Sequence, residues 1–309
     1  MSRKDRSLFP PIPEPLPLPV IDNHTHVGTD RPAQVQNRSE DGEPRYPLLI
    51  EGQLEGMKQS GISHAITVGC EVPDLQDVID LADQHPEFSA AIAIHPNEAA
   101  MHAGVREIGP DGLEHVAKNY HENYDLDAAI NLVEELATAH GIVAIGETGL
   151  DYFRTGEEGR AAQAESFRAH IALAKRLGLP MQIHDREAHE DTVRILLEEG
   201  APDRTVFHCF SGDRALAEIL AEHGWYASFA GTVTFPKNED LREAAQVLPA
   251  ELILVETDAP YLTPHPYRGR PNAPYLMNLT VRYLAEIRSV ALDTLCTTLA
   301  NTTNSVYFA

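Results

Sequence analysis

The sequence contains few cysteines, no long apolar run and no apolar leader, and each shortage excludes a class of protein. Its three cysteines, Cys70, Cys209 and Cys296, are widely spaced and form no Cys-X-X-Cys pair, which argues against a disulfide framework and fits a reducing compartment. No run approaches about 18 consecutive apolar residues, so we expect no transmembrane segment. Six prolines between Pro10 and Pro19 stand where the apolar core of a secretory signal would lie. We therefore expect a cytoplasmic protein that does not engage a membrane.

Basic residues are also scarce. Lys and Arg together number 24 against 47 Asp and Glu, which gives a formal net charge of −23. Nucleic-acid-binding proteins gain much of their affinity by neutralising phosphates with Lys and Arg, and this chain has neither a basic patch nor an interleaved aromatic stripe. An anionic substrate would therefore need a local cationic feature, such as bound metal ions.

The 309 residues instead show a regular alternation of short apolar stretches and helical patterns. Most of the apolar stretches are continuous, as expected for strands that are buried on both faces. The predicted strands are 20–27, 64–70, 88–95, 142–147, 180–185, 204–209, 226–231 and 252–257. The predicted helices are 74–84, 125–140, 159–178, 187–199, 213–223, 238–248 and 274–288.

Eight strands that alternate with helices predict an α/β protein, a TIM (β/α)8 barrel in a single domain. An open doubly wound sheet would fit the same alternation. We expect residues 1–19 to form a proline-rich N-terminal arm and residues 20–309 to form the barrel. Two long connections, 28–49 and 97–123, would lie at the C-terminal rim, where barrel enzymes carry their specificity loops.

Ionisable side chains recur at the C-terminal ends of the predicted strands, where a barrel core normally has Val, Ile or Leu. These residues are Asp22, His24, His26, Glu147, His184, His208 and Asp258. A single histidine on an apolar strand is more often a hydrogen-bonded core residue than a ligand. However, His24 and His26 are two residues apart on one strand, so both rings face the same way and can chelate one ion. Four histidines and two carboxylates at one barrel mouth therefore predict a metal site.

The size of this set favours two divalent ions over one. A single catalytic zinc ion uses three protein ligands and an open position, whereas six ligands suit two ions that share a bridging carboxylate. Such a pair generates a nucleophile from water and stabilises the attacking and leaving oxygens, which points to a hydrolase and suits a phosphate ester. Four imidazoles favour Zn²⁺, Mn²⁺, Ni²⁺ or Co²⁺, whereas Mg²⁺ prefers oxygen ligands.

Seven segments, in chain order, resemble the motifs of the TatD family of metal-dependent deoxyribonucleases. They are 21–28 (IDNHTHVG), 93–96 (AIHP), 145–153 (IGETGLDYF), 182–188 (QIHDREA), 207–212 (FHCFSG), 256–264 (ETDAPYLTP) and 267–274 (YRGRPNAP). The resemblance spans nearly the whole chain. It implies a TIM barrel of the amidohydrolase superfamily, a divalent-metal requirement and 3′–5′ exonuclease or related phosphodiesterase activity.

The resemblance also implies a role for each strand-end residue. His24, His26 and Asp258 would hold the first ion, and Glu147 would bridge both ions. Asp258 would in addition take a proton from the attacking water.

The second ion would be held by His184 and His208. The family often has His-Pro-His where this chain has His95-Pro96-Asn97, a change that alters one substrate contact.

Other residues are expected to support this site. Asp22 would not bind the metal itself but would orient a ligand histidine or the neighbouring backbone through a hydrogen bond. His95 would contact a phosphate or a metal-bound water. Arg186 and Arg268 could clamp a phosphate with two hydrogen bonds each, or could simply pair with surface carboxylates.

Two alternatives to a deoxyribonuclease use the same metal site. An amidohydrolase-like enzyme would cleave a small ester, amide or lactam, and a catalytically silent barrel would only bind metal. Binuclear members of the superfamily often bridge their ions with a carboxylated lysine on strand four, whereas that strand here has Glu147 and no lysine. The scarcity of cations restricts a nucleic-acid partner to contacts at a few phosphates, such as those of a single-stranded 3′ end of DNA, or favours a small phosphoester. The sequence indicates no obligate protein partner.

Overall fold

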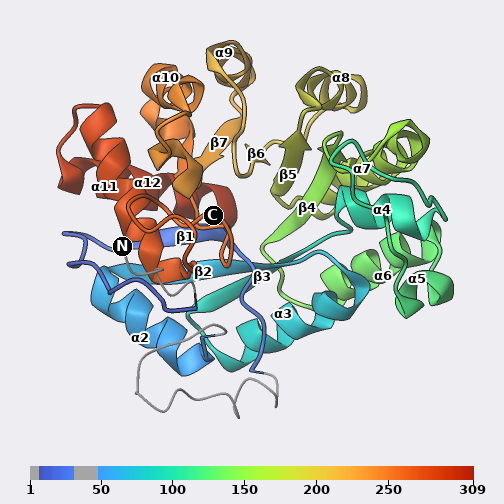
Figure 1. Ribbon diagram of the computed structural model, residues 1–309, viewed down its shortest axis with the longest axis horizontal. Helices are drawn as coiled ribbons and strands as arrows, with labels where there is room; N and C mark the ends of the chain where they lie inside the picture. Colours follow the sequence, from blue (N-terminus) through green and yellow to red (C-terminus); the bar gives the residue numbers. More distant parts are fainter. Residues whose placement is uncertain (1–6, 31–47) are drawn as a thin grey trace.

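Eight parallel strands form the centre of the molecule in the computed structural model, which describes residues 7–30 and 48–309 (Figure 1). The strands pair in chain order, from β1 beside β2 to β7 beside β8. They are β1 (Val20–Thr25), β2 (Ile62–Gly69), β3 (Phe88–Ile92), β4 (Ala144–Asp151), β5 (Met181–Arg186), β6 (Thr205–Phe207), β7 (Tyr226–Phe229) and β8 (Ile253–Val255).

Helices surround the strands (Figure 1). The α-helices are α2 (Ile50–Ser60), α3 (Val72–Gln84), α4 (Pro96–His102), α5 (Asn119–Asn123), α6 (Leu126–Ala139), α7 (Glu157–Leu177), α8 (His189–Glu199), α9 (Arg214–His223), α10 (Glu239–Val247), α11 (Met277–Ile287) and α12 (Leu292–Tyr307). Three short 3₁₀ helices are η1 (Gly231–Thr234), η2 (Ala250–Leu252) and η3 (Pro274–Leu276). Within the described ranges, no helix is both long and apolar enough to cross a membrane.

The first strand is joined to the segment that follows the last one. The His24 carbonyl accepts a hydrogen bond from Asp258 N–H at 3.0 Å, and His26 N–H donates to the Ala259 carbonyl at 2.8 Å. An open doubly wound sheet reverses its strand order partway, and this sheet does not. The predicted TIM barrel is therefore confirmed, with each predicted strand present near its expected position.

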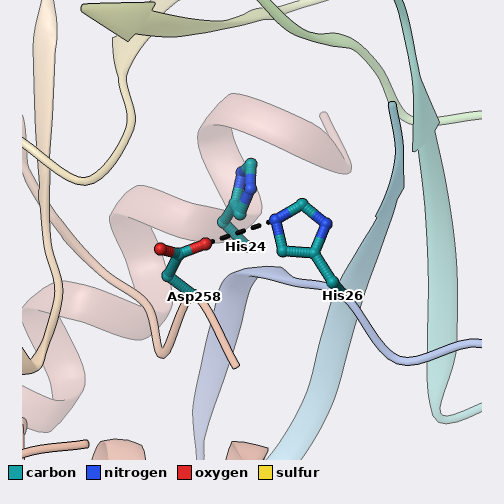
Figure 2. A group of neighbouring side chains, drawn as sticks. All are labelled: His24, His26 and Asp258. Carbon is teal, nitrogen blue, oxygen red and sulfur yellow. Dashed lines mark ion pairs between the residues drawn. The ribbon is translucent and has the colours of Figure 1, made fainter. Parts of the chain in front are cut away.

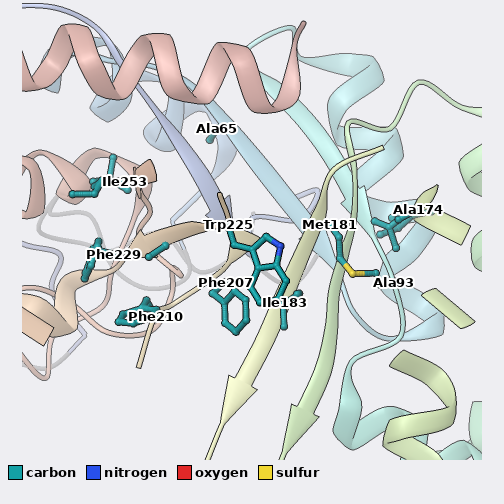
Figure 3. Close-up of a cluster of buried hydrophobic side chains, with 14 of the residues drawn as sticks. Ala65, Ala93, Ala174, Met181, Ile183, Phe207, Phe210, Trp225, Phe229 and Ile253 are labelled. Atoms are coloured by element: carbon teal, nitrogen blue, oxygen red, sulfur yellow. The ribbon is translucent and has the colours of Figure 1, made fainter. Parts of the chain in front are cut away.

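Continuous burial explains why the strands read as apolar runs. Every residue of β4 is buried, and Phe167 and Ile171 of α7 pack into the same core. Figure 3 shows part of this core, where the ring of Phe207 in β6 stacks on the ring of Trp225 with centroids 6.0 Å apart.

Helices α2, α4, α5 and α12 lie outside the predicted set, and the two longest of them, α2 and α12, have sequences with weak helical signals. In α12, threonines of low helix propensity hide the pattern. The Thr297 hydroxyl bonds the Asp293 carbonyl at 2.9 Å, and the Thr303 hydroxyl bonds the Leu299 carbonyl at 2.9 Å. In α2, Gly56 lies on the buried face, where a Cβ would come within 2.6 Å of the Tyr275 ring. Close packing, which tertiary structure alone supplies, therefore stabilises both helices.

The segments expected at the ends and rim are partly described. Residues 7–19 lie against α2 and η3: Leu16 N–H donates to the Ser60 carbonyl at 3.0 Å, and the Tyr275 hydroxyl donates to the Pro10 carbonyl at 2.6 Å. Residues 1–6 of the expected arm, and 31–47 of the first long connection, lie outside the described residues. The second connection, 97–123, contains most of α4 and all of α5.

Candidate metal centre

The six residues expected to bind metal meet at the C-terminal mouth of the barrel. They are His24 in β1, His26 just after it, Glu147 in β4, His184 in β5, His208 after β6 and Asp258 after β8. Parallel strands bring their C-terminal ends to one rim, which explains why residues so far apart in sequence converge. A cavity of about 790 Å³ opens on the group, and all of its members except the fully buried His24 line the wall.

His24, His26 and Asp258 form the first half of the centre (Figure 2). His26 Nε2 lies 3.2 Å from Asp258 Oδ1, and the rings of His24 and His26 meet edge to face with centroids 5.1 Å apart. One donor atom from each of the three residues lies within 4.8 Å of the others. This spacing allows one cation to contact all three.

The hydrogen bonds that His24 and His26 make through Nδ1 show which ring nitrogen carries the proton. The Gln182 amide donates to the Asn23 carbonyl at 2.7 Å, so its oxygen faces His24 Nδ1 at 2.9 Å and that nitrogen carries the proton. His26 Nδ1 likewise donates to the Val68 carbonyl at 3.1 Å. In the neutral form of each ring the lone pair is therefore on Nε2, and the Nε2 of His24 is buried without any hydrogen-bond partner. A buried orphaned lone pair aimed at a carboxylate-lined space fits a metal ligand.

Glu147 joins this half to a second one. Its Oε1 lies 3.5 Å from His26 Nε2. Its Oε2 lies 3.1 Å from His184 Nδ1 and 2.5 Å from His208 Nε2. The rings of His24 and His208 stack with centroids 3.9 Å apart. Imidazole and carboxylate donors crowded in this way suit divalent transition-metal ions, which would neutralise the carboxylates and replace ring protons.

In the metal-free protein the carboxylates hold protons on several of these rings. Burial alone would lower the pKa of His26, but the hydrogen bond with Asp258 and the charge of Glu147 raise it to about 9. For His184 the hydrogen bonds with Asp151 and Glu147 also outweigh burial, and its pKa is about 9. The neighbouring His208 and His95 hold the pKa of Glu147 well below its usual value despite burial.

Two expected supporting residues lie beside the centre. Asp22 is buried and ties β1 to the end of β8, because its Oδ1 accepts from Thr257 N–H at 2.9 Å. His95 Nδ1 accepts from Asn97 N–H at 3.1 Å, and burial lowers the pKa of His95 to about 4. The neutral His95 ring therefore carries its proton on Nε2, where it can donate to an anion.

The two arginines expected to bind phosphate are separated. Arg186 lines the cavity and lies over the Phe153 ring at 3.9 Å. Arg268 lies over the Phe235 ring at 4.4 Å and lines an adjacent cavity of about 770 Å³. The two cavities share Tyr261 and Leu262 in their walls.

Four residues that contact the proposed ligands were not predicted from the sequence. They are Gln182, Asp151, Glu256 and Cys70, whose thiol donates to Glu147 Oε1 at 3.2 Å. The period of two along a strand was the available signal, because Gln182 precedes His184 by two residues and Glu256 precedes Asp258 by two. Asp151 and Cys70 carried no such signal.

A further group, Glu98, His102 and His121, also has donor atoms within 4.8 Å of one another. Lys118 N–H donates to His121 Nδ1 at 2.8 Å, so the His121 proton is on Nε2, which lies 2.9 Å from Glu98 Oε2. Because that ring nitrogen has no lone pair for a cation, the group is a hydrogen-bonded network that joins α4 to α5.

Metal binding should release protons and strengthen with pH up to about pH 9. His26, His184 and His208 are protonated at neutral pH because nearby carboxylates raise their pKa values, and each must lose a proton to bind an ion. We expect about three protons to be released per protein at about pH 7, and the apparent affinity for Zn²⁺ to rise as pH increases through 7 and 8. Calorimetric titration in buffers of different ionisation enthalpy measures this release. Affinity that levels off above about pH 6.5, the ordinary histidine pKa, would contradict it.

Comparison with known proteins places the chain in a family. Residues 21–308 match the family model described as TatD related DNase. The uncharacterized metal-dependent hydrolase TatD of Mycobacterium tuberculosis is 39% identical over 242 residues, which cover 77% of this chain and 83% of that protein. YabD of Bacillus subtilis, also a metal-dependent hydrolase by name, is 30% identical over 89% of this chain and 93% of its own length. The crystal structure of YJJV, a TatD homologue from Escherichia coli K12, matches with a TM-score of 0.75 and 25% identity, over 94% of this chain and 98% of that one. The resemblance carried by the seven motifs is thus confirmed, and the chain belongs to the TatD-related DNase family of metal-dependent hydrolases.

Proposed function

We propose that the chain is a two-metal phosphodiesterase that removes nucleotides from the 3′ ends of single-stranded DNA. The position of Glu147 carries the proposal, because one oxygen faces His26 while the other faces His184 and His208. A carboxylate between two groups of imidazoles suits a bridging ligand. We call the site formed by His24, His26 and Asp258 the first ion position, and the site formed by His184 and His208 the second ion position.

The ions and the side chains would divide the chemistry. When bound, the ions would polarise the phosphoryl oxygens and lower the pKa of the attacking water. Asp258 would accept the proton of that water, since its side chain lines the cavity and is 13% exposed. The Nε2–H of His95 would donate a hydrogen bond to a phosphate oxygen, and Arg186 would bind the phosphate from the cavity wall.

The shape and charge of the site favour a strand end over a duplex. A cavity of about 790 Å³ has the size of a small-ligand pocket, so it suits a terminal nucleotide. Among the described residues, the arginines and lysines in its wall are Arg154, Arg186 and Lys237, enough for a few phosphates and too few for a long tract. The adjacent cavity with Arg268 suits the next part of the strand.

One observation favours the second candidate, hydrolysis of a small ester, amide or lactam. The net charge of −23 repels polyanions, and a small neutral substrate would need no cationic track. The two candidates differ in whether the Arg268 cavity takes part, because a small substrate would end within the metal cavity.

Cleavage of DNA should require a free end. We expect a linear single-stranded oligonucleotide to be hydrolysed at least about tenfold faster than the same sequence closed into a circle, because only an end can enter the cavity. The logarithm of the apparent affinity should fall with the logarithm of salt concentration at a slope of about −0.7 per phosphate contact, for about one to three contacts. Rates of product release from both DNAs, measured at several salt concentrations, test this.

Arg268→Ala tests whether the adjacent cavity binds the next part of the DNA strand. It should raise KM for the oligonucleotide about tenfold, the loss of one good charged contact, while leaving hydrolysis of a small phosphodiester unchanged. Arg214→Ala, which removes an exposed guanidinium paired with Glu218 on α9, should change neither. Equal rates on circles and linear strands would overturn the end requirement. Hydrolysis of a small ester without any cleavage of DNA would favour the second candidate.

A further inference from the structure

The four ligand histidines differ in what supports each ring from behind. Each has one nitrogen facing Glu147 or Asp258, and its other nitrogen faces a different acceptor. In the first ion position these acceptors are uncharged: the Gln182 amide oxygen, 2.9 Å from His24, and the Val68 carbonyl, 3.1 Å from His26.

In the second ion position both acceptors are carboxylates. His184 Nε2 is hydrogen-bonded to Asp151 Oδ2 at 3.1 Å, whereas His208 Nδ1 lies 3.4 Å from Glu256 Oε1 as an ion-pair contact without a hydrogen bond. Both carboxylates are buried, with Asp151 1% exposed and Glu256 fully enclosed. Charged groups are rarely enclosed in this way unless they are paired.

Backbone and side-chain donors fix both carboxylates in place. Asp151 Oδ1 accepts from the N–H groups of Phe153 at 3.1 Å and Arg154 at 2.8 Å. Its Oδ2 accepts from the Asn97 amide at 3.2 Å. Glu256 Oε1 accepts from Cys209 N–H at 2.8 Å.

The two positions also differ in their own ligands. The first includes the carboxylate of Asp258, 3.2 Å from a ligand nitrogen, whereas the described part of the chain gives the second only imidazoles besides the shared Glu147. Negative charge is therefore supplied directly at the first position and from behind the rings at the second. A carboxylate behind an imidazole fixes its tautomer and makes the opposite nitrogen a stronger donor to a metal.

We propose that Asp151 and Glu256 are positioning residues that make the second ion position competent to hold its ion. This inference rests on the proposed two-metal site. It predicts that the two positions can be disabled separately, the second through Asp151 or Glu256 and the first through Asp258.

The test is the Zn²⁺ content and affinity of the full-length protein, measured by elemental analysis and calorimetry. The wild type should bind two ions. Asp151→Asn should weaken one of them about 10- to 100-fold and leave the other unchanged. Its amide would present an N–H to His184 Nε2 and favour the proton on Nδ1, the nitrogen that faces Glu147. Glu256→Gln should act in the same direction while keeping the bond from Cys209 N–H.

Combining variants identifies which ion is lost. Asp258→Asn alone should retain one tightly bound ion, and Asp258→Asn with Asp151→Asn should retain none. Asn97→Ala removes a contact to the same Asp151 oxygen without removing charge, and should keep both ions. Circular dichroism and thermal unfolding of each metal-free variant separate loss of an ion from loss of the fold.

The number of bound ions and their affinities test this inference separately from the two-metal proposal. Two ions bound to Asp151→Asn and Glu256→Gln with wild-type affinity, or equal weakening of both ions, would overturn this inference and leave the two-metal proposal standing. A wild type that binds a single ion would overturn both.

Discussion

Glu147→Gln should reduce the hydrolysis of a phosphodiester by about 10³-fold or more. Glu147 reaches both halves of the centre, with Oε1 3.5 Å from His26 Nε2 and Oε2 2.5 Å from His208 Nε2. Glutamine keeps the shape but replaces one oxygen by an amide that donates protons where a ligand is required. Charge stabilisation by metal ions is worth several kcal/mol, and each 1.36 kcal/mol is about tenfold in rate.

His24→Ala should cost less than Glu147→Gln, because His24 serves only the first ion position. Rates and Zn²⁺ contents of the two variants, measured side by side, check the prediction. Glu158→Gln, which changes an exposed carboxylate at the start of α7, should retain full activity. Equal and modest losses for Glu147→Gln and His24→Ala, with both ions retained, would contradict a bridging role.

Asp258→Asn should lower kcat by about 10²- to 10⁴-fold, the range for a missing acid–base group, with a smaller change in KM. The substitution suits the backbone, because Asp258 has φ of 52° and asparagine tolerates this left-handed conformation. The amide cannot accept a proton from water as a carboxylate does.

Metal concentration separates the two roles of Asp258. If it acts only as a ligand, excess Zn²⁺ should restore kcat; if it also accepts a proton, kcat stays low when both ions are bound. Recovery to within about tenfold of the wild type would refute the proton-accepting role. Asp185→Asn is the matched control, since Asp185 lines the same cavity but pairs with His189 at 2.7 Å.

The sequence was sufficient to predict the barrel and the meeting of the six strand-end residues. Strands buried on both faces must be continuously apolar, so their positions can be read directly. Once the strands are parallel, residues at their C-terminal ends share one rim, which brings Glu147 and Asp258 together although 111 positions separate them in the numbering. The pair His24 and His26 follows from the period of two along a single strand.

The sequence could not give the position of residues whose partners depend on loop geometry or register. Arg268 belongs to a motif shared with the family, yet the loop that carries it places its guanidinium over Phe235, in the adjacent cavity. Helix α12 has a threonine-rich sequence of low helix propensity, and packing of Leu295 and Leu299 into the core stabilises it.

The residue types and spacings of this chain thus determined a parallel barrel with imidazoles and carboxylates at its mouth, because strand periodicity is local. Only the tertiary structure decided which nitrogen of each ring faces the centre. That choice depends on single hydrogen bonds between distant strands, such as His24 to Gln182 across 158 positions and His184 to Asp151 across 33. The register between strands determines which side chains are close enough for these hydrogen bonds. The order of residues along one strand does not specify that register.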